Sequence, residues 1–306
     1  TKELYCLDSR IFYKLKDIQE KSLLGFLNLL LNSEERENIL DIIEQIVDLT
    51  AEQRKNFSDI LKKTHLENII ETMHFIEARY KVIEILKLLV YNFDKFTNER
   101  DNIQKIIEHH YWLFGEQYNL VSADYSMKTA LEKYNYLLYG SRSPKAQLEP
   151  DVENERRMDI FLCGVRKVEN SFGNFLDENV IVELKSPKVT LSKTVLRQVE
   201  DYMDFIRRQS AFNSILCRWK FIAVSKTIDD EVKARYKTFE SNGKPGLVSM
   251  IENYEVYAFT WADLFKKFEL SHDFVLDKLK FDKDKIINEL LKEKNAIILL
   301  NKIDLT

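Results

Sequence analysis

Two strand-like segments carry charged residues whose types and spacing suit a hydrolytic site. Asp159 lies in the segment 156–162, and Glu183 and Lys185 follow in the apolar segment 180–185. Alternate side chains of an extended strand share a face, so Glu183 and Lys185 point the same way, roughly 6 to 7 Å apart along the strand. A carboxylate and an ammonium on one face of an otherwise apolar strand indicate a chemical role.

The same alternation places Asp159 beside Arg157 on its own strand. Two carboxylates that converge with a lysine on one sheet face suit a hard divalent cation, because Mg²⁺ takes oxygen ligands and keeps several waters. The ion polarises a phosphoryl oxygen and lowers the pKa of a bound water, while a lysine orients that water and stabilises charge on the phosphate. The pattern therefore predicts phosphodiester hydrolysis.

The elements that must position these residues are two strands and a helix. The connection 166–179 contains Ser-Phe-Gly-Asn at 171–174, which is typical of a hairpin, so we expect the two strands to be adjacent and antiparallel. After Pro187 the apolar period changes to that of a helix beginning near residues 192–194. Gln198 and Tyr202 lie four residues apart on this helix and therefore share one face.

The first hundred residues contain almost no helix breakers. No proline precedes Pro144, and only Gly25 precedes Gly115. Apolar residues recur at three and four within 22–31, 33–49, 56–75 and 76–91. We expect an all-α helical bundle over residues 1–100, followed by a second domain over 101–306.

The second domain mixes strand and helix patterns. A helix over 103–112 carries Glu108 near its end, strands are expected at 117–123, 219–225, 246–251 and 254–259, and helices at 229–240 and in the tail from 261. The fold class is therefore α+β, with a mixed sheet flanked by helices in the second domain. Glu108 either faces solvent or reaches a site built on the sheet.

Composition limits the partners and the compartment. The formal net charge of -4 argues against a uniformly basic nucleic-acid coat, so any affinity for DNA must come from a local patch. Three well-separated cysteines without a CxxC pair fit a reducing, cytoplasmic compartment and argue against a structural zinc. No apolar run reaches the roughly 18 to 20 residues that span a bilayer, so we expect no membrane partner.

Asp159, Glu183-x-Lys185 and Gln198-x-x-x-Tyr202, in this order on strand, strand and helix, resemble the PD-(D/E)XK nuclease superfamily. Met158 stands where proline would precede the acid. Together with the stretch 107–115, the motifs resemble the nuclease domain of Shedu proteins, which are single-protein bacterial anti-phage defences. This resemblance covers roughly residues 101–260 and implies a restriction-endonuclease-like fold.

The resemblance also implies roles. Asp159 and Glu183 would bind Mg²⁺, for which Mn²⁺ can substitute, Glu108 would complete the metal site, and Lys185 would position the nucleophilic water. Gln198 and Tyr202 would hold DNA and arrange the site. The family implies a homo-oligomer, a dimer or tetramer, and a variable N-terminal domain that regulates the nuclease or assembles the oligomer. We expect an endonuclease rather than an exonuclease.

Basic residues flank the expected site and can neutralise phosphates, contacts that position a duplex without reading its sequence. They lie near the two strands and along the following helix: Arg156, Arg157, Lys188, Lys193, Arg197, Arg207 and Arg208.

Two other functions stay open from the sequence. The chain could keep a nuclease fold without the chemistry and act as a nucleic-acid binding module, whose binding would be metal-independent and steeply salt-dependent. It could also be a protein-interaction scaffold, in which Glu183 and Lys185 form an ion pair on a half-exposed strand, worth roughly 0 to 1 kcal/mol.

Overall fold

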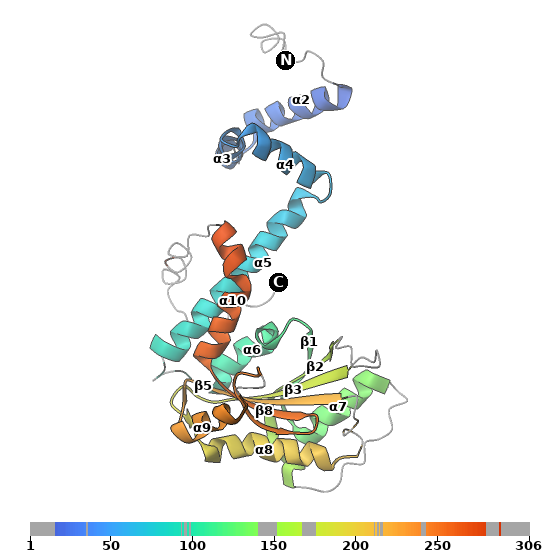
Figure 1. The fold of residues 1–306 in the computed structure, drawn as a ribbon. Helices are drawn as coiled ribbons and strands as arrows, with labels where there is room; N and C mark the ends of the chain where they lie inside the picture. Colours follow the sequence, from blue (N-terminus) through green and yellow to red (C-terminus); the bar gives the residue numbers. More distant parts are fainter. Residues whose placement is uncertain are drawn as a thin grey trace. The chain divides into compact units, whose positions relative to one another are not determined.

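The computed structural model divides into two compact units, residues 1–76 and 77–306 (Figure 1). It describes residues 16–34, 36–92, 94, 97, 99–139, 152–166, 176–210, 212, 214, 217–239, 243–279 and 288. The expected connection at 171–174 lies outside these residues. The expected boundary near residue 100 stays a prediction.

The first unit is helical, as its apolar period indicates. Its helices are α2 (Asp17–Asn32), α3 (Arg36–Val47), α4 (Ala51–Leu61) and the first part of α5 (Leu66–Lys87). Thr50 caps α4, because its side chain accepts a hydrogen bond from the Gln53 amide and the Gln53 side chain accepts one from the Thr50 amide. The single helix expected over 56–75 is two helices, α4 and α5, and α5 runs through the boundary expected at 75/76.

A packed N-terminal bundle is not confirmed. No residue within 16–30, 32–34 and 36–76 is buried, and the hydrophobic core of the described chain begins at Tyr80. Apolar side chains of these helices stay exposed, among them Ile42 at 58% and Val47 at 65%. Periodicity set the helical state correctly, but it could not specify what covers the apolar stripes.

The second unit contains a six-stranded mixed sheet with helices on both faces. Its sheet strands are β1 (Tyr118–Ser126), β2 (Arg157–Arg166), β3 (Leu176–Leu184), β5 (Cys217–Ser225), β7 (Leu247–Ile251) and β8 (Tyr254–Thr260), and β4 (Thr190–Leu191) pairs with β6 (Thr227–Ile228). The helices include α6 (Lys105–His109), α7 (Met127–Tyr139), α8 (Lys193–Arg208), α9 (Asp230–Phe239) and α10 (Trp261–Leu279), with a π-helix η3 (Glu99–Gln104) before α6 and a 3-10 turn η4 (Tyr111–Phe114) after it.

The strand order is β1-β2-β3-β5-β8-β7. β2 and β3 are antiparallel neighbours, which confirms the expected pairing of the two strands that carry Asp159 and Glu183. β3, β5 and β8 are parallel, and α8 lies in the connection from β3 to β5, because parallel strands need a crossover. Within the described residues, the expected strands and helices of this unit are confirmed in type and order, whereas α7 was not expected. The helical tail expected from 261 to 303 lies outside the described residues beyond 279, apart from residue 288.

Alternation along the strands separates two cores. Ile181 and Phe221 pack in one cluster with α7, α8 and α9, whereas their neighbours Val180, Val182 and Ile222 point to the other face. Figure 1 shows α8 on one side of the sheet and α6 and α10 on the other. The α8 side therefore receives the odd-numbered side chains of β3, including Glu183.

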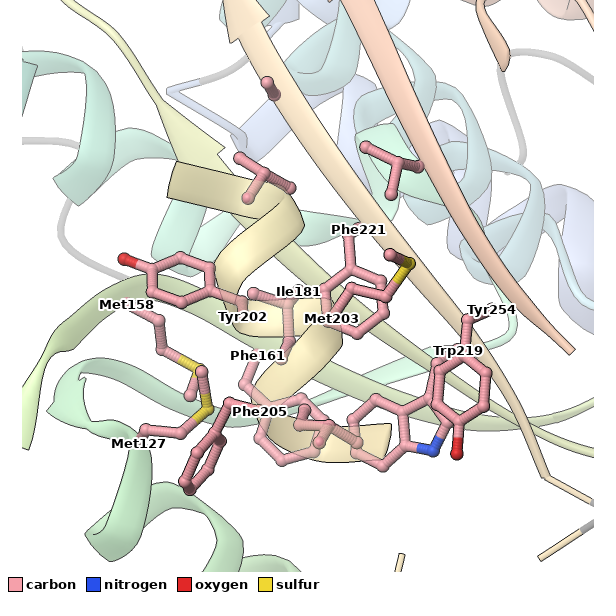
Figure 2. Close-up of a cluster of buried hydrophobic side chains, with 14 of the residues drawn as sticks. Met127, Met158, Phe161, Ile181, Tyr202, Met203, Phe205, Trp219, Phe221 and Tyr254 are labelled. Atoms are coloured by element: carbon pink, nitrogen blue, oxygen red, sulfur yellow. The ribbon is translucent and has the colours of Figure 1, made fainter. Parts of the chain in front are cut away.

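Aromatic rings fill the α8 side of the sheet. Trp219 is fully buried, with ring centroids 5.7 Å from Phe161 and 6.2 Å from Phe221, and its Nε1 donates to the Phe212 carbonyl at 3.0 Å. Figure 2 shows Tyr202 and Met158 at one end of this cluster and Trp219 at the other. The core thus holds α8 against the sheet and fixes the position of its first turns.

Among the described helices, none combines the length and the apolarity that crossing a membrane requires.

Candidate functional site

The end of β3 carries a buried ion pair. Lys185, just past the strand, donates from Nζ to Oε1 of Glu183 at 2.6 Å. The side chains of Glu183 and Lys185 are only 5% and 15% exposed. They share a face, as the spacing predicts, and the pair is not the half-exposed surface contact that the scaffold hypothesis requires.

Helix α8 brings an amide and a phenol to this pair. Ser192 caps the helix by accepting from the Val195 amide at 3.4 Å, which places Gln198 in the second turn. The Oε1 atom of Gln198 accepts from Lys185 Nζ at 2.9 Å, and its Nε2 donates to Glu183 Oε1 at 2.6 Å and to the Tyr202 hydroxyl at 2.9 Å. Gln198 therefore contacts all three partners.

Tyr202 completes the network from the next turn of α8. Its hydroxyl lies 2.9 Å from the Arg157 carbonyl and 3.2 Å from Glu183 Oε2, and it donates to these acceptors. Burial raises the pKa of Tyr202, and the Glu183 carboxylate raises it further. The phenol therefore keeps its proton and serves as a hydrogen-bond donor between β2 and β3.

Asp159 lies where β2 and β3 stop pairing through their backbones. The ladder ends at Ile160 opposite Val182, and beyond it Oδ2 of Asp159 accepts from the Leu184 amide at 2.7 Å. The residue is 6% exposed. Its carboxylate is thereby held against the backbone adjacent to Glu183, so the structure brings both expected acids to one end of the strand pair.

Glu108 approaches the site from α6 through Gln104. The Gln104 side chain is 2% exposed and donates to the Asp159 carbonyl at 3.2 Å. Burial raises the pKa of Glu108, the nearby Asp124 carboxylate also raises it, and His109 and a hydrogen bond with Gln104 act in the opposite direction. Glu108 is half-buried and faces these groups, so it is not a plain surface residue.

Asp124 is a neighbour of the site that sequence reasoning missed. It lies on β1 opposite Asp159, since Ala123 pairs with Ile160 and Tyr125 with Met158. Its carbonyl accepts from Arg157 Nε at 3.1 Å and Nη2 at 2.6 Å, and its Oδ2 accepts from Nη2 at 2.8 Å. The only available signal was an aspartate within a strand pattern, where this residue is disfavoured.

The backbone of Asp124 is left-handed, with φ of 54°. For residues other than glycine, that conformation costs about 1 kcal/mol or more. The free energy of unfolding of Asp124→Gly is therefore expected to be about 1 kcal/mol higher than that of Asp124→Ala. Both variants lose the carboxylate, but only glycine adopts this backbone conformation without strain. Urea denaturation of the two variants measures the difference.

Asp177 on β3 supplies the control for this comparison. It is exposed, and positive φ among the described residues other than glycine is confined to Asp124 and Glu252. There the order should reverse, with Asp177→Ala more stable than Asp177→Gly. The same order at both positions would contradict a strained Asp124.

Several residues expected to contact DNA are paired with acids. Arg157 binds Asp124, Lys193 lies 3.2 Å from Glu231, Arg197 lies 3.9 Å from Asp201, Arg156 lies 3.5 Å from Asp201, and Arg207 lies 3.2 Å from Asp204. Lys188 and Arg208 are exposed. The surface around α8 is thus a mixture of both signs, and the assignment of these residues to DNA stays a prediction.

The acids at the site have the donor chemistry of a Mg²⁺ centre. Mg²⁺ is commonly held by one or two carboxylates together with waters and substrate phosphates, and Asp159 and Glu183 provide two such carboxylates. Within the described ranges, no three His, Cys, Asp or Glu side chains gather closely enough to hold a metal ion. The pair fits a Mg²⁺ ion shared with substrate, and Glu108 as a third ligand stays a prediction.

Comparison with known proteins adds little to this geometry. No protein-family model matches the chain, and no curated protein matches it. The chain is similar to the crystal structure of a repair endonuclease from Pyrococcus abyssi, with 15% identity over 54% of this chain and 48% of that chain and a TM-score of 0.26. The match spans about half the length of that protein, and so low a score carries no weight for fold or function.

Proposed function

We propose that this protein is a metal-dependent nuclease that hydrolyses phosphodiester bonds in DNA. One observation carries the proposal: a buried Glu183–Lys185 pair, bridged by Gln198 and contacted at Glu183 by Tyr202, lies beside a carboxylate held against the same strand end. Buried charges are costly unless paired, and a plain structural pair does not require a second acid next to it.

Each residue of the site has a separate role in the proposed mechanism. Asp159 and Glu183 would hold Mg²⁺, or Mn²⁺ in its place, and the ion would supply charge stabilisation on the phosphate and an acidified water. Lys185, held by Gln198, orients the attacking water and stabilises charge on the phosphate oxygens. Tyr202 keeps its proton and fixes Glu183 relative to the strand that carries Arg157.

The resemblance to Shedu proteins supports the finer parts of the proposal. These are endonucleolytic cutting, a role in defence of a bacterial cytoplasm against phage, and a homo-oligomer. The exposed apolar side chains of α2, α3 and α4 are suited to assembly or to regulation of the nuclease, since exposed apolar surface of this kind marks interaction sites.

Cutting of closed circular DNA by the purified full chain tests the proposal. Such DNA has no ends, so cleavage that requires Mg²⁺ or Mn²⁺ and stops with chelator identifies an endonuclease. Lys185→Met is expected to slow cleavage by about 10²- to 10³-fold, because it removes a preorganised charge at the phosphate. Metal binding, measured as the rise in melting temperature with Mn²⁺, should persist.

Lys87→Met is the matched control, because Lys87 is also partly buried between two acids, Glu84 and Glu269, each at 2.9 Å. It should cut like the wild type. No cleavage with any divalent ion, combined with metal-independent DNA binding, would instead identify a binding module, and equal cutting by Lys185→Met would refute the assigned role of the lysine.

A further inference from the structure

A cavity lies on the sheet face away from Glu183. Ile222 and Phe259 line this cavity of about 700 Å³, whereas their strand neighbours Phe221 and Ala258 pack in the core cluster on the α8 side. Helix α10 forms another wall with Leu264, and η4 contributes Phe114. Cavities of roughly 300 to 1,000 Å³ are the usual size for small-molecule sites.

The walls are mostly apolar and partly aromatic, the lining that such sites commonly have. The rings and aliphatic side chains come from η4, β5, α9, β8 and α10, and they are Phe114, Ile222, Tyr236, Phe259, Leu264 and Leu270.

Several polar groups around the cavity are already engaged. The Tyr236 hydroxyl donates to the Ala258 carbonyl at 2.6 Å, and Lys244 lies 2.5 Å from Glu255. Asp263 caps α10 by accepting from the Thr260 amide at 2.7 Å and hydroxyl at 2.6 Å. None of these three side chains needs a ligand to satisfy its charge or its hydrogen bonds.

Lys267 differs from these three side chains, because it is exposed and makes no ion pair with any residue that the structure describes; the adjacent cavity residue Lys266 is likewise exposed and makes none with the described residues. It lies on α10 between this cavity and a smaller one of about 240 Å³. Lys220, a cation that acts on Lys267 electrostatically, already pairs with the buried Glu178 at 2.6 Å. Desolvation at the wall lowers the pKa of Lys267, the Lys220 ammonium lowers it further, and Glu178 acts in the opposite direction.

We propose that this cavity binds a small organic anion, with an aromatic body against the apolar walls and its one anionic group paired with Lys267. The anion would form a charge-assisted contact with Lys267 at the exposed edge of the cavity, and the rings of Phe114 and Phe259 supply contact for a flat apolar body. This binding site is distinct from the nuclease site and does not depend on the proposed nuclease activity.

Calorimetric titration of the full chain with anilinonaphthalene sulfonate, an aromatic anion, tests this site. The wild type is expected to show a class of one site per chain. Lys267→Met should weaken binding at that site by about tenfold or more, because it removes a charge-assisted contact. Leu270→Glu should do the same by placing a carboxylate at the cavity wall, and its 71% exposure makes it safe for folding.

Two controls separate this site from the exposed apolar helices of the first unit. Phenylnaphthylamine, which lacks the sulfonate, should bind the wild type and Lys267→Met equally. Lys128→Met, an exposed change on α7, should leave binding of the anion unchanged. Absence of a one-per-chain site, or anion binding that neither Lys267→Met nor Leu270→Glu weakens, would overturn the proposal.

Discussion

Replacing Glu183 with glutamine is expected to reduce metal-dependent DNA cleavage by about 10³-fold or more, the size of effect seen when a group acting within a catalytic unit is lost. The substitution keeps the shape of the side chain and one acceptor oxygen for Lys185 and Gln198, so the network around it can still form. It removes the charge that would hold the metal ion. Rates of plasmid nicking under saturating Mg²⁺ measure the effect.

Glu178→Gln is the matched control, because Glu178 resembles Glu183 in its burial and in its pairing with a lysine. Glu178 lies five positions earlier on β3, is 1% exposed, and pairs with Lys220 at the same distance of 2.6 Å, but its side chain points to the opposite face. Per folded molecule, Glu178→Gln should retain cleavage. If Glu183→Gln and Glu178→Gln cut equally well, the proposed nuclease site is wrong.

A metal readout distinguishes loss of chemistry from loss of the ion. Binding of Mn²⁺ to the folded state raises the melting temperature by mass action. This rise should be present in the wild type, absent or much smaller in Glu183→Gln, and present in Glu178→Gln. A full rise in Glu183→Gln would place the ion elsewhere.

The substitutions Asp159→Asn and Asp159→Ala are expected to separate catalysis from stability. Both should lower cleavage by about 10³-fold, because both remove a carboxylate from the metal site. Asparagine can still accept from the Leu184 amide, so its free energy of unfolding should stay near that of the wild type. Alanine leaves this buried amide without its acceptor and should cost about 1 to 3 kcal/mol.

Asp229 provides the same comparison away from the site. It accepts from the Val232 amide at 2.8 Å at the start of α9. Asp229→Asn should preserve stability and cutting, and Asp229→Ala should cost about 1 kcal/mol while cutting persists. Cleavage by Asp159→Asn at the wild-type rate would remove this carboxylate from the mechanism, whatever the stabilities.

Much of the local structure followed from the sequence because its cause is local. The two-residue period of 180–185 put Glu183 and Lys185 on one face of a strand. The helical period after Pro187 put Gln198 and Tyr202, four residues apart, on one face of a helix. Both relations are confirmed by direct contacts. Such spacings survive in any fold that keeps the strand and the helix.

Contacts between residues far apart in the sequence could not be predicted from the local apolar periods. Gln104 and Asp124 come to the site from η3 and β1, because packing against β2 brings them there and no period in their own segments marks them. The same holds for the buried Glu178–Lys220 pair and for the cavity beside Lys267. Their positions depend on strand order and register, which are set by many weak contacts across the whole domain.

The sequence by itself therefore determined the types of most elements, the faces of the side chains on β3 and α8, and the constellation Asp159, Glu183, Lys185, Gln198 and Tyr202. Only the tertiary structure decided that Gln198 bridges the ion pair and that Asp159 binds the strand of Glu183 through a backbone amide. It also left the N-terminal apolar stripes exposed within the described helices. Periodicity is a property of neighbouring residues, whereas burial and partnership depend on what the folded chain places opposite them.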